Sequence, residues 1–152
     1  MNIITLKLYV LYIYEERIKE IYNKLILTTE PYEGIRPLDF MNNEWTARFE
    51  VKASGSWTIE VLPLSSLEML TIPGTKNGEG DYVFGIIGGT PDIAKIKGNS
   101  SSRYFAVLSY GNDKDLLVNT TDPYEGEVIL DSKTILFEVK AVGKWSIEVT
   151  TR

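Results

Sequence analysis

The stretch FEVKASGSWTIEV at residues 49–61 returns as FEVKAVGKWSIEV at residues 137–149, with differences at three of the thirteen positions. In both copies apolar and polar residues alternate on either side of a central glycine. Such alternation is typical of β-strands with one buried and one solvated face, and glycine suits the positive φ of a tight turn. The motif therefore predicts an antiparallel hairpin in each copy, turning at residues 54–56 and 142–144.

A second block shows that the duplication extends beyond this motif. TTEPYEG at residues 28–34 returns as TTDPYEG at residues 120–126. Upstream, residues 1–14 answer loosely to residues 97–110, whereas residues 66–97 have no counterpart in the first copy. Because internal repeats of this density define an architecture, we expect one complete repeat, preceded by a repeat that lacks its opening strands.

Most of the remaining chain also has the composition of short strands, rich in β-branched and aromatic residues between clusters of Gly, Pro, Asn and Asp. A short helical turn is an alternative at residues 15–22, where apolar residues have helical spacing. Many short strands with regular turns predict a sandwich or a barrel. The expected strands cover residues 3–14, 24–29, 81–88, 91–97, 103–110, 115–120 and 125–131.

The expected fold is therefore all-β, with tandem antiparallel β-sandwich repeats of immunoglobulin-like or jelly-roll-like type. We place an incomplete repeat at residues 1–64, a connector at 65–80 and a complete repeat at 81–152; a single merged domain is the alternative. An incomplete sandwich leaves a strand edge open, and an open edge recruits another strand. We expect this edge to be covered by residues 62–72, by the second copy or by a neighbouring chain, which would give a homodimer.

The second half resembles a known module. Its motifs GEGDYV, FAV, LLVN and YEG precede the repeated core motif in that order. This order is similar to an uncharacterised all-β module of prokaryotic secreted and lipoprotein-type proteins (GxGDxV, FxV, LLVN, YxG, LxVxAxG, WxI). The resemblance covers residues 78–149 well and residues 8–61 partly, and it implies a sandwich and an extracytoplasmic location without catalytic residues. Because residues 1–14 lack the features of a signal peptide, a cytoplasmic location is the alternative.

Composition limits the classes of function. The 152 residues carry a formal charge of −5 and a pI near 4.8, which argues against nucleic acid as a partner because that needs a basic patch. Cys and His are absent, so disulfides, thiolate and imidazole catalysis and the usual zinc ligands are excluded. No run of eighteen apolar residues exists, so we expect no membrane span.

The aromatic residues of the repeated motif have the parity of a buried face. We therefore expect Trp57 and Trp145, with Phe49 and Phe137, to be structural core markers rather than binding platforms.

Three further aromatic residues are candidates for ligand contact. Tyr32 and Tyr124 lie in predicted turns, where a structural role is the favoured interpretation. Trp45 has no counterpart in the second copy; a place in the core or at its rim is favoured over a sugar-stacking face.

Polar clusters give little support for a metal or a reaction. Asn77, Glu79 and Asp81 alternate and could offer oxygen ligands to calcium, but a solvated turn explains them equally well. Serine residues have no histidine to activate them, and nothing nominates a carboxylate pair for glycoside hydrolysis. We expect no catalytic residues, no resident metal and no cofactor.

These observations favour a non-catalytic interaction or structural module of an extracytoplasmic or envelope-associated system, with a protein or a glycan as partner. A carbohydrate-binding module is the alternative, which predicts exposed aromatic residues around Trp45. A glycosidase-like enzyme is a more distant alternative, which predicts two converging carboxylates in a cleft.

Overall fold

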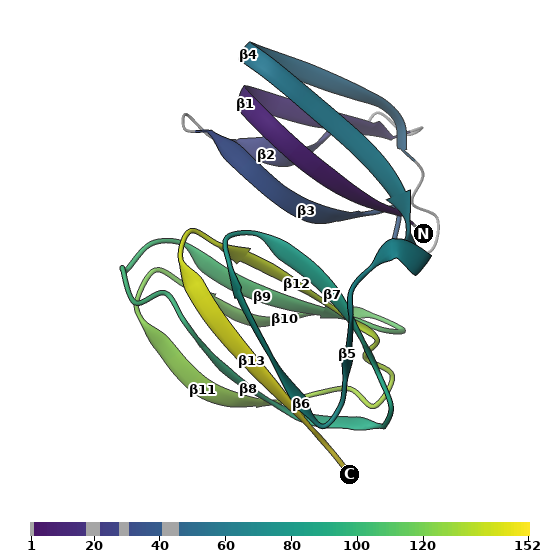
Figure 1. Ribbon diagram of the computed structural model, residues 1–152, viewed down its shortest axis with the longest axis vertical. Helices are drawn as coiled ribbons and strands as arrows, with labels where there is room; N and C mark the ends of the chain where they lie inside the picture. Colours follow the sequence, from purple (N-terminus) through teal and green to yellow (C-terminus); the bar gives the residue numbers. More distant parts are fainter. Residues whose placement is uncertain (1, 18–21, 28–30, 41–45) are drawn as a thin grey trace. The chain divides into compact units, whose positions relative to one another are not determined.

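The computed structural model describes residues 2–17, 22–27, 31–40 and 46–152. Their regular structure consists of β-strands and one short 3₁₀ turn, η1 (Leu64–Ser66), as Figure 1 shows. This confirms the prediction of an all-β chain. The chain divides into two compact units, Met1–Ser66 and Leu67–Arg152.

The first unit is a four-stranded sheet of β1 (Asn2–Arg17), β2 (Tyr22–Leu27), β3 (Tyr32–Leu38) and β4 (Thr46–Pro63). β1 is central, and all its partners are antiparallel. β4 pairs with one edge of β1 along nearly its whole length. The other edge is shared by β3, beside the first half of β1, and by β2, beside the second half. A small apolar cluster accompanies the sheet, formed by Ile26, Leu38, Tyr32, Phe49, Val51 and Ile59.

The predicted hairpin at residues 54–56 is wrong, because β4 continues through these residues as one strand. On either side of them β4 keeps pairing with β1, Ala53 with Val10 and Trp57 with Leu8, and the register shifts in between. The extra residues therefore form an irregularity of the β-bulge kind, which bends a strand without reversing it. Glycine serves such a bulge as well as it serves a hairpin, and the sequence pattern is the same for both.

The second unit contains two sheets. The five-stranded sheet has the order β10 (Lys114–Thr120), β9 (Phe105–Tyr110), β12 (Leu136–Ala141), β7 (Tyr82–Ile87), β5 (Met69–Thr71). The four-stranded sheet has the order β11 (Tyr124–Ile129), β8 (Pro91–Gly98), β13 (Lys144–Thr151), β6 (Gly74–Glu79). Neighbouring strands are antiparallel, except that β5 runs parallel to β7.

One apolar core lies between these two sheets. The five-stranded sheet contributes side chains from β7, β9 and β12, and the four-stranded sheet contributes side chains from β8 and β13. At its centre Phe84 stacks on Phe137 with ring centroids 5.2 Å apart, and on Trp145 at 6.1 Å. Because strand residues alternate between faces, this shared core accounts for the period-two pattern of the second half of the chain.

Short links carry the chain from one sheet to the other. β12 and β13 belong to different sheets, so the predicted hairpin at residues 142–144 is also wrong. The positive φ predicted there occurs instead at Gly80 (73°), between β6 and β7, and at Gly88 (95°), between β7 and β8. In a corner between sheets, as in a hairpin, alternate residues of both strands point into the core. The alternation of apolar and polar residues is therefore the same for both connections.

The predicted connector and the predicted helical turn both differ from the structure. The segment at 65–80, expected as a connector, contains β5 and β6 and belongs mostly to the second unit. Of the expected helical turn at residues 15–22, the first three residues end β1 and the last begins β2; residues 18–21 lie outside the described residues.

Candidate functional site

The two copies of the repeated motif differ sharply in burial. In the second copy Trp145 is 3% exposed, and the side chain of Phe137 is fully buried. In the first copy Trp57 is 50% exposed and Val61 is 46% exposed, while Phe49 is only partly buried. The expectation that Trp57 packs in a core therefore does not describe this structure, although its sequence surroundings match those of Trp145.

Strand pairing supplies the physical reason. In the second unit β12 lies between β9 and β7, and β13 lies between β8 and β6, so both edges of each strand are covered. Among the described strands of the first unit, β4 pairs with β1 alone. As far as the described residues go, one edge of β4 is therefore open, and the side chains beside it lack the cover that β6 and β7 provide in the second unit. An open strand edge presents unpaired N–H and C=O groups that can bind another strand.

The β6–β7 segment (Gly74–Ile87) shows how such an edge is covered. It runs antiparallel to β13 and β12, with Gly78 opposite Trp145. A Cβ at Gly78 would collide with the Trp145 ring, so glycine at this position lets the indole lie across the strand. The indole Nε1 donates a hydrogen bond to the carbonyl of Gly80 at 3.0 Å.

Asp81 fixes the corner of the same segment. Its Oδ1 accepts a hydrogen bond from the backbone N–H of Ala141 at 2.9 Å, and the N–H of Gly80 donates to the carbonyl of Gly143 at 3.2 Å. These bonds satisfy backbone groups where β12 ends and β13 begins, which otherwise would lose hydrogen bonds on burial. The GxGD sequence therefore lets the β6–β7 segment follow β13 and β12 through the corner between them.

A polar cluster holds the outer side of this segment. Glu68 accepts hydrogen bonds from Lys76 at 2.6 Å and from the Tyr82 hydroxyl at 2.7 Å. The bond from Lys76, followed by that from Tyr82, lowers the pKa of Glu68. Burial, followed by the hydrogen bond to Glu68, raises the pKa of Tyr82 to about 12. Lys76 also lies over the Tyr82 ring, 5.0 Å from its centroid.

The residues considered as calcium ligands do not form a cluster. Asn77 and Glu79 are exposed on β6, whereas the carboxylate of Asp81 is engaged by the Ala141 N–H. Over the part of the chain that the structure describes, no group of three or more acidic, His or Cys side chains is placed to hold a metal ion.

The other candidate contact residues have separate locations. Tyr32 begins β3, is partly buried and packs against the apolar cluster of the first unit. Tyr124 begins β11, is partly buried and packs against the core of the second unit. Trp45 lies outside the described residues. The two tyrosines thus contribute to packing in their own units, and they lie at the starts of strands rather than in the predicted turns.

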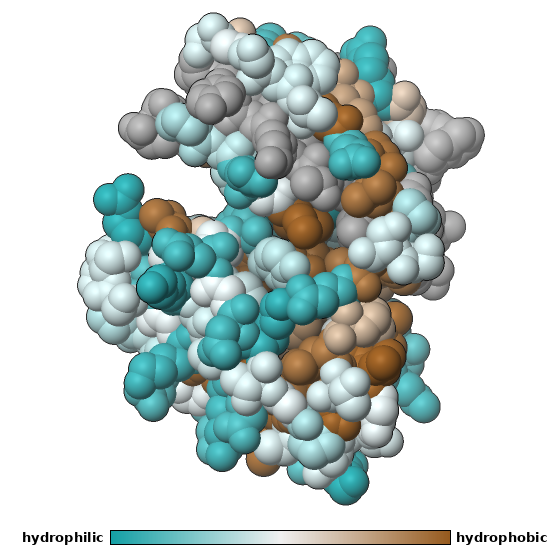
Figure 2. All heavy atoms as spheres, in the orientation of Figure 1, coloured by the Kyte–Doolittle hydropathy of each residue, from teal (hydrophilic) through white to brown (hydrophobic). Residues whose placement is uncertain are grey.

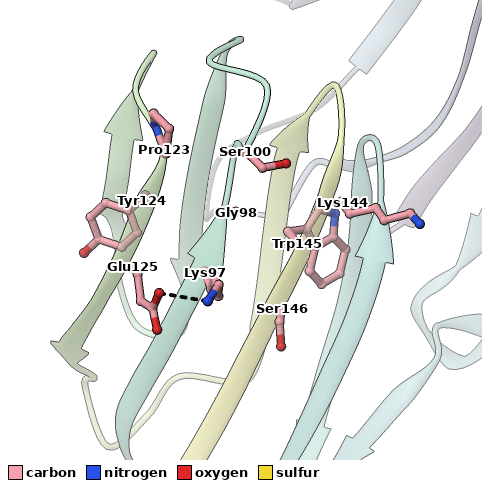
Figure 3. A pocket seen from close by; sticks show the side chains of 9 residues that line it. All are labelled: Lys97, Gly98, Ser100, Pro123, Tyr124, Glu125, Lys144, Trp145 and Ser146. Carbon is pink, nitrogen blue, oxygen red and sulfur yellow. Dashed lines mark ion pairs between the residues drawn. The ribbon is translucent and has the colours of Figure 1, made fainter.

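A shallow groove lies beside Tyr124 on the second unit (Figure 3). Its volume is about 430 Å³, and its walls include Pro123, Tyr124 and the ion pair between Lys97 and Glu125, whose charged atoms are 2.9 Å apart. In Figure 3 the side chain of Lys144 extends away from this pair. A partly exposed ring beside paired charges is a surface that a polar small molecule can contact.

A neighbouring groove of about 310 Å³ is lined by three glutamates, Glu125, Glu127 and Glu148. Lysines accompany them: Lys95 lies 3.7 Å from Glu127 and 4.0 Å from Glu148. Exposed ion pairs of this kind contribute little to stability. Together with Lys97, this groove on the four-stranded sheet carries two lysines and three glutamates, so its formal charge is −1.

The surface of the second unit is uneven in polarity. On the face shown in Figure 2, polar side chains prevail where β8, β11 and β13 lie, and apolar side chains gather near β5, where Met69 is 44% exposed. None of the described segments forms a helix that is long and apolar enough to cross a membrane.

Comparisons with protein-family models, curated proteins and solved structures found no significant match to the chain. The candidate site therefore comes from comparing the two copies of the repeated motif, and it is the open edge of β4.

Sequence reasoning missed the functional meaning of Gly78, Gly80 and Asp81, which it treated as a turn or as metal ligands. The signal was present in the GxGD pattern at residues 78–81. What the sequence alone did not show is that this segment pairs with the repeated motif itself.

Proposed function

We propose that the chain is a non-catalytic β-sandwich module, present as one complete repeat and one incomplete repeat, that binds a protein partner along the open edge of β4. The observation that carries the proposal is the difference in pairing: β4 pairs with β1 alone among the described strands, whereas β12 and β13 have partners on both edges. Addition of a strand to an open edge is a general mode of peptide recognition.

Exposure beside this edge supports the proposal. Trp57 and Val61 are about half exposed, and covering them removes apolar surface from water, which favours association. Aromatic residues such as tryptophan are frequent anchors of protein interfaces. The sequence resemblance to secreted and lipoprotein-type modules supports an extracytoplasmic or envelope-associated setting for this binding.

A peptide selection tests the proposal. Random extended peptides of about fourteen residues are selected on the immobilised chain and then measured against variants of β4. Val61→Lys places a charge beside the open edge, and Ala53→Pro removes a backbone donor from β4. Thr58→Lys is the matched control, because it adds the same charge to an exposed position on the opposite face of β4 from Trp57 and Val61.

We expect the selected peptides to lose at least tenfold in affinity with Val61→Lys and Ala53→Pro, and to change less than twofold with Thr58→Lys. Circular dichroism of each variant shows whether the sheet still forms. Peptides that bind all variants equally would contradict the proposal.

A carbohydrate-binding module is the second candidate, and the groove beside Tyr124 favours it. On this alternative a glycan array identifies ligands whose binding falls in Lys97→Ala and Glu125→Ala but persists in Val61→Lys. The opposite pattern, or no bound glycan, supports the protein partner.

A further inference from the structure

We infer that the segment which binds β4 lies outside residues 1–152 and carries the pattern of residues 78–84, glycine, any residue, glycine, aspartate, aromatic, any residue, aromatic. This inference rests on the proposed function, because it names the partner of the same edge. Its basis is the second unit, where the β6–β7 segment covers the edge of β12 and β13 that corresponds to the open edge of β4.

The two edges are nearly identical in sequence. Residues 49–53 and 137–141 are both FEVKA, and residues 57–61 differ from 145–149 at one position. In the second unit β7 pairs Phe84 with Phe137, and β6 pairs Gly78 with Trp145. The same register on β4 places an aromatic residue of the partner opposite Phe49 and a glycine opposite Trp57.

The first glycine is required by the indole. Because a Cβ at Gly78 would collide with the Trp145 ring, only glycine leaves the ring free to cross the neighbouring strand. Trp57 is half exposed in the first unit. A partner glycine opposite Trp57 lets this ring fold over the added strand, as Trp145 does over β6.

The second glycine and the aspartate form the corner. Gly80 has a φ of 73°, which glycine adopts at little cost. Asp81 then accepts the N–H of Ala141 at 2.9 Å. Ala53 corresponds to Ala141, lies next to the bulge of β4 and is exposed, so its N–H is the expected donor to the partner's aspartate.

The aromatic positions complete the core. Phe84 is fully buried and stacks on Phe137, and Tyr82 contacts Trp145 with ring centroids 6.2 Å apart. In the first unit Phe49 and Val51 are only partly buried. Aromatic side chains of the partner would cover them.

Energetics disfavour the β6–β7 segment of a second copy of this chain as the partner. The β6–β7 segment of each chain is already in use, since Val83 and Phe84 are fully buried in their own unit. Lending this segment to a second copy would expose the donor's core to water, a cost that a segment not yet packed in a core does not incur.

A synthetic peptide with the sequence of residues 73–87, PGTKNGEGDYVFGII, serves as the probe. It is labelled and titrated into the whole chain, and backbone amide signals are followed by NMR. We expect one peptide to bind per chain, with shifts along β4 and none along β12 and β13.

Altered peptides test each element of the pattern. Gly78→Val in the peptide should weaken binding at least tenfold, Asp81→Ala several-fold, and a scrambled peptide should not bind. In the protein, Trp57→Leu should weaken binding at least fivefold, whereas Thr58→Lys should change it less than twofold.

The outcomes separate this inference from the proposed function. Equal binding of the scrambled peptide at β4 would overturn the inference and leave β4 as a binding edge. If the probe does not bind but the random-peptide selection finds peptides that depend on the β4 edge, the inference is overturned and the proposed function stands. If neither the probe nor a selected peptide binds at this edge, both proposals are overturned. Shifts along β12 and β13, or a chain dimer that the probe dissociates, would assign the segment to exchange between copies instead.

Discussion

β4 and the pair β12–β13 carry almost the same thirteen residues, yet one is half exposed and the other forms the centre of a core. Phe137 and Ile147 are fully buried, whereas Phe49 and Ile59 are only partly buried. Because the side chains are matched, the difference arises from what lies beside the strands: β6 and β7 in the second unit, and no described strand on the corresponding edge of β4. Burial here is a property of the neighbours rather than of the motif.

The largest expected effect comes from removing the two matched tryptophans. Trp145→Ala empties a core position and should lower the free energy of unfolding of the second unit by about 3–5 kcal/mol. Trp57→Ala removes a half-exposed ring and should cost the first unit about 1 kcal/mol or less. Urea titration followed by NMR signals of each unit measures both, and equal losses would contradict the comparison.

A smaller effect is expected at the glycine that faces the indole. Gly78→Val forces a side chain into the Trp145 ring and should destabilise the second unit by about 1–3 kcal/mol through overpacking. Gly143→Ala is the control, because a Cβ there meets only Ser101 Oγ at 3.6 Å. If both substitutions have the same effect on the urea midpoint, the glycine is not required by the ring.

Asp81→Ala removes the acceptor of the Ala141 N–H. Loss of this bond should cost about 1–2 kcal/mol, because a partly buried donor loses its partner. Asp113→Ala, at an exposed position, should cost less than about 0.5 kcal/mol. Thermal unfolding by calorimetry compares them, and an unchanged midpoint in Asp81→Ala would contradict a structural role for this carboxylate.

The smallest expected effect depends on pH. Because the pKa of Tyr82 is raised to about 12, the folded state favours the neutral phenol. Its contribution to stability is complete below about pH 10 and is lost as pH rises through about 12. Urea unfolding between pH 9 and 12 should therefore show a steeper loss in the wild type than in Tyr82→Phe. Parallel curves would show that Tyr82 makes no such contribution.

Sequence reasoning reached the all-β class because alternation in stretches such as residues 137–149 reflects a local property, the two faces of a strand. It gave the wrong connection at Gly55 and Gly143, because a bulge, a corner between sheets and a hairpin share the same parity and the same need for a small residue.

The site depended on contacts that are distant in the chain. Asp81 meets Ala141 across sixty positions, and Trp145 meets Gly80 across sixty-five. Such distant pairs leave no pattern in the local sequence. Asp81 was therefore interpreted from its neighbours Asn77 and Glu79 alone, as a possible calcium ligand. Trp57 looked buried because parity records which face a residue occupies, not whether another strand covers it.

Hydrogen exchange at Ala53 and Ala141 tests most directly whether β4 is an open edge. These alanines occupy matching places, and the N–H of Ala141 donates to Asp81. Each amide is compared with its paired neighbour in the same unit. We predict strong protection of Ala141 and rapid exchange of Ala53 in the free chain, with protection of Ala53 gained when the probe peptide binds. Equal protection of both amides in the free chain would contradict the account.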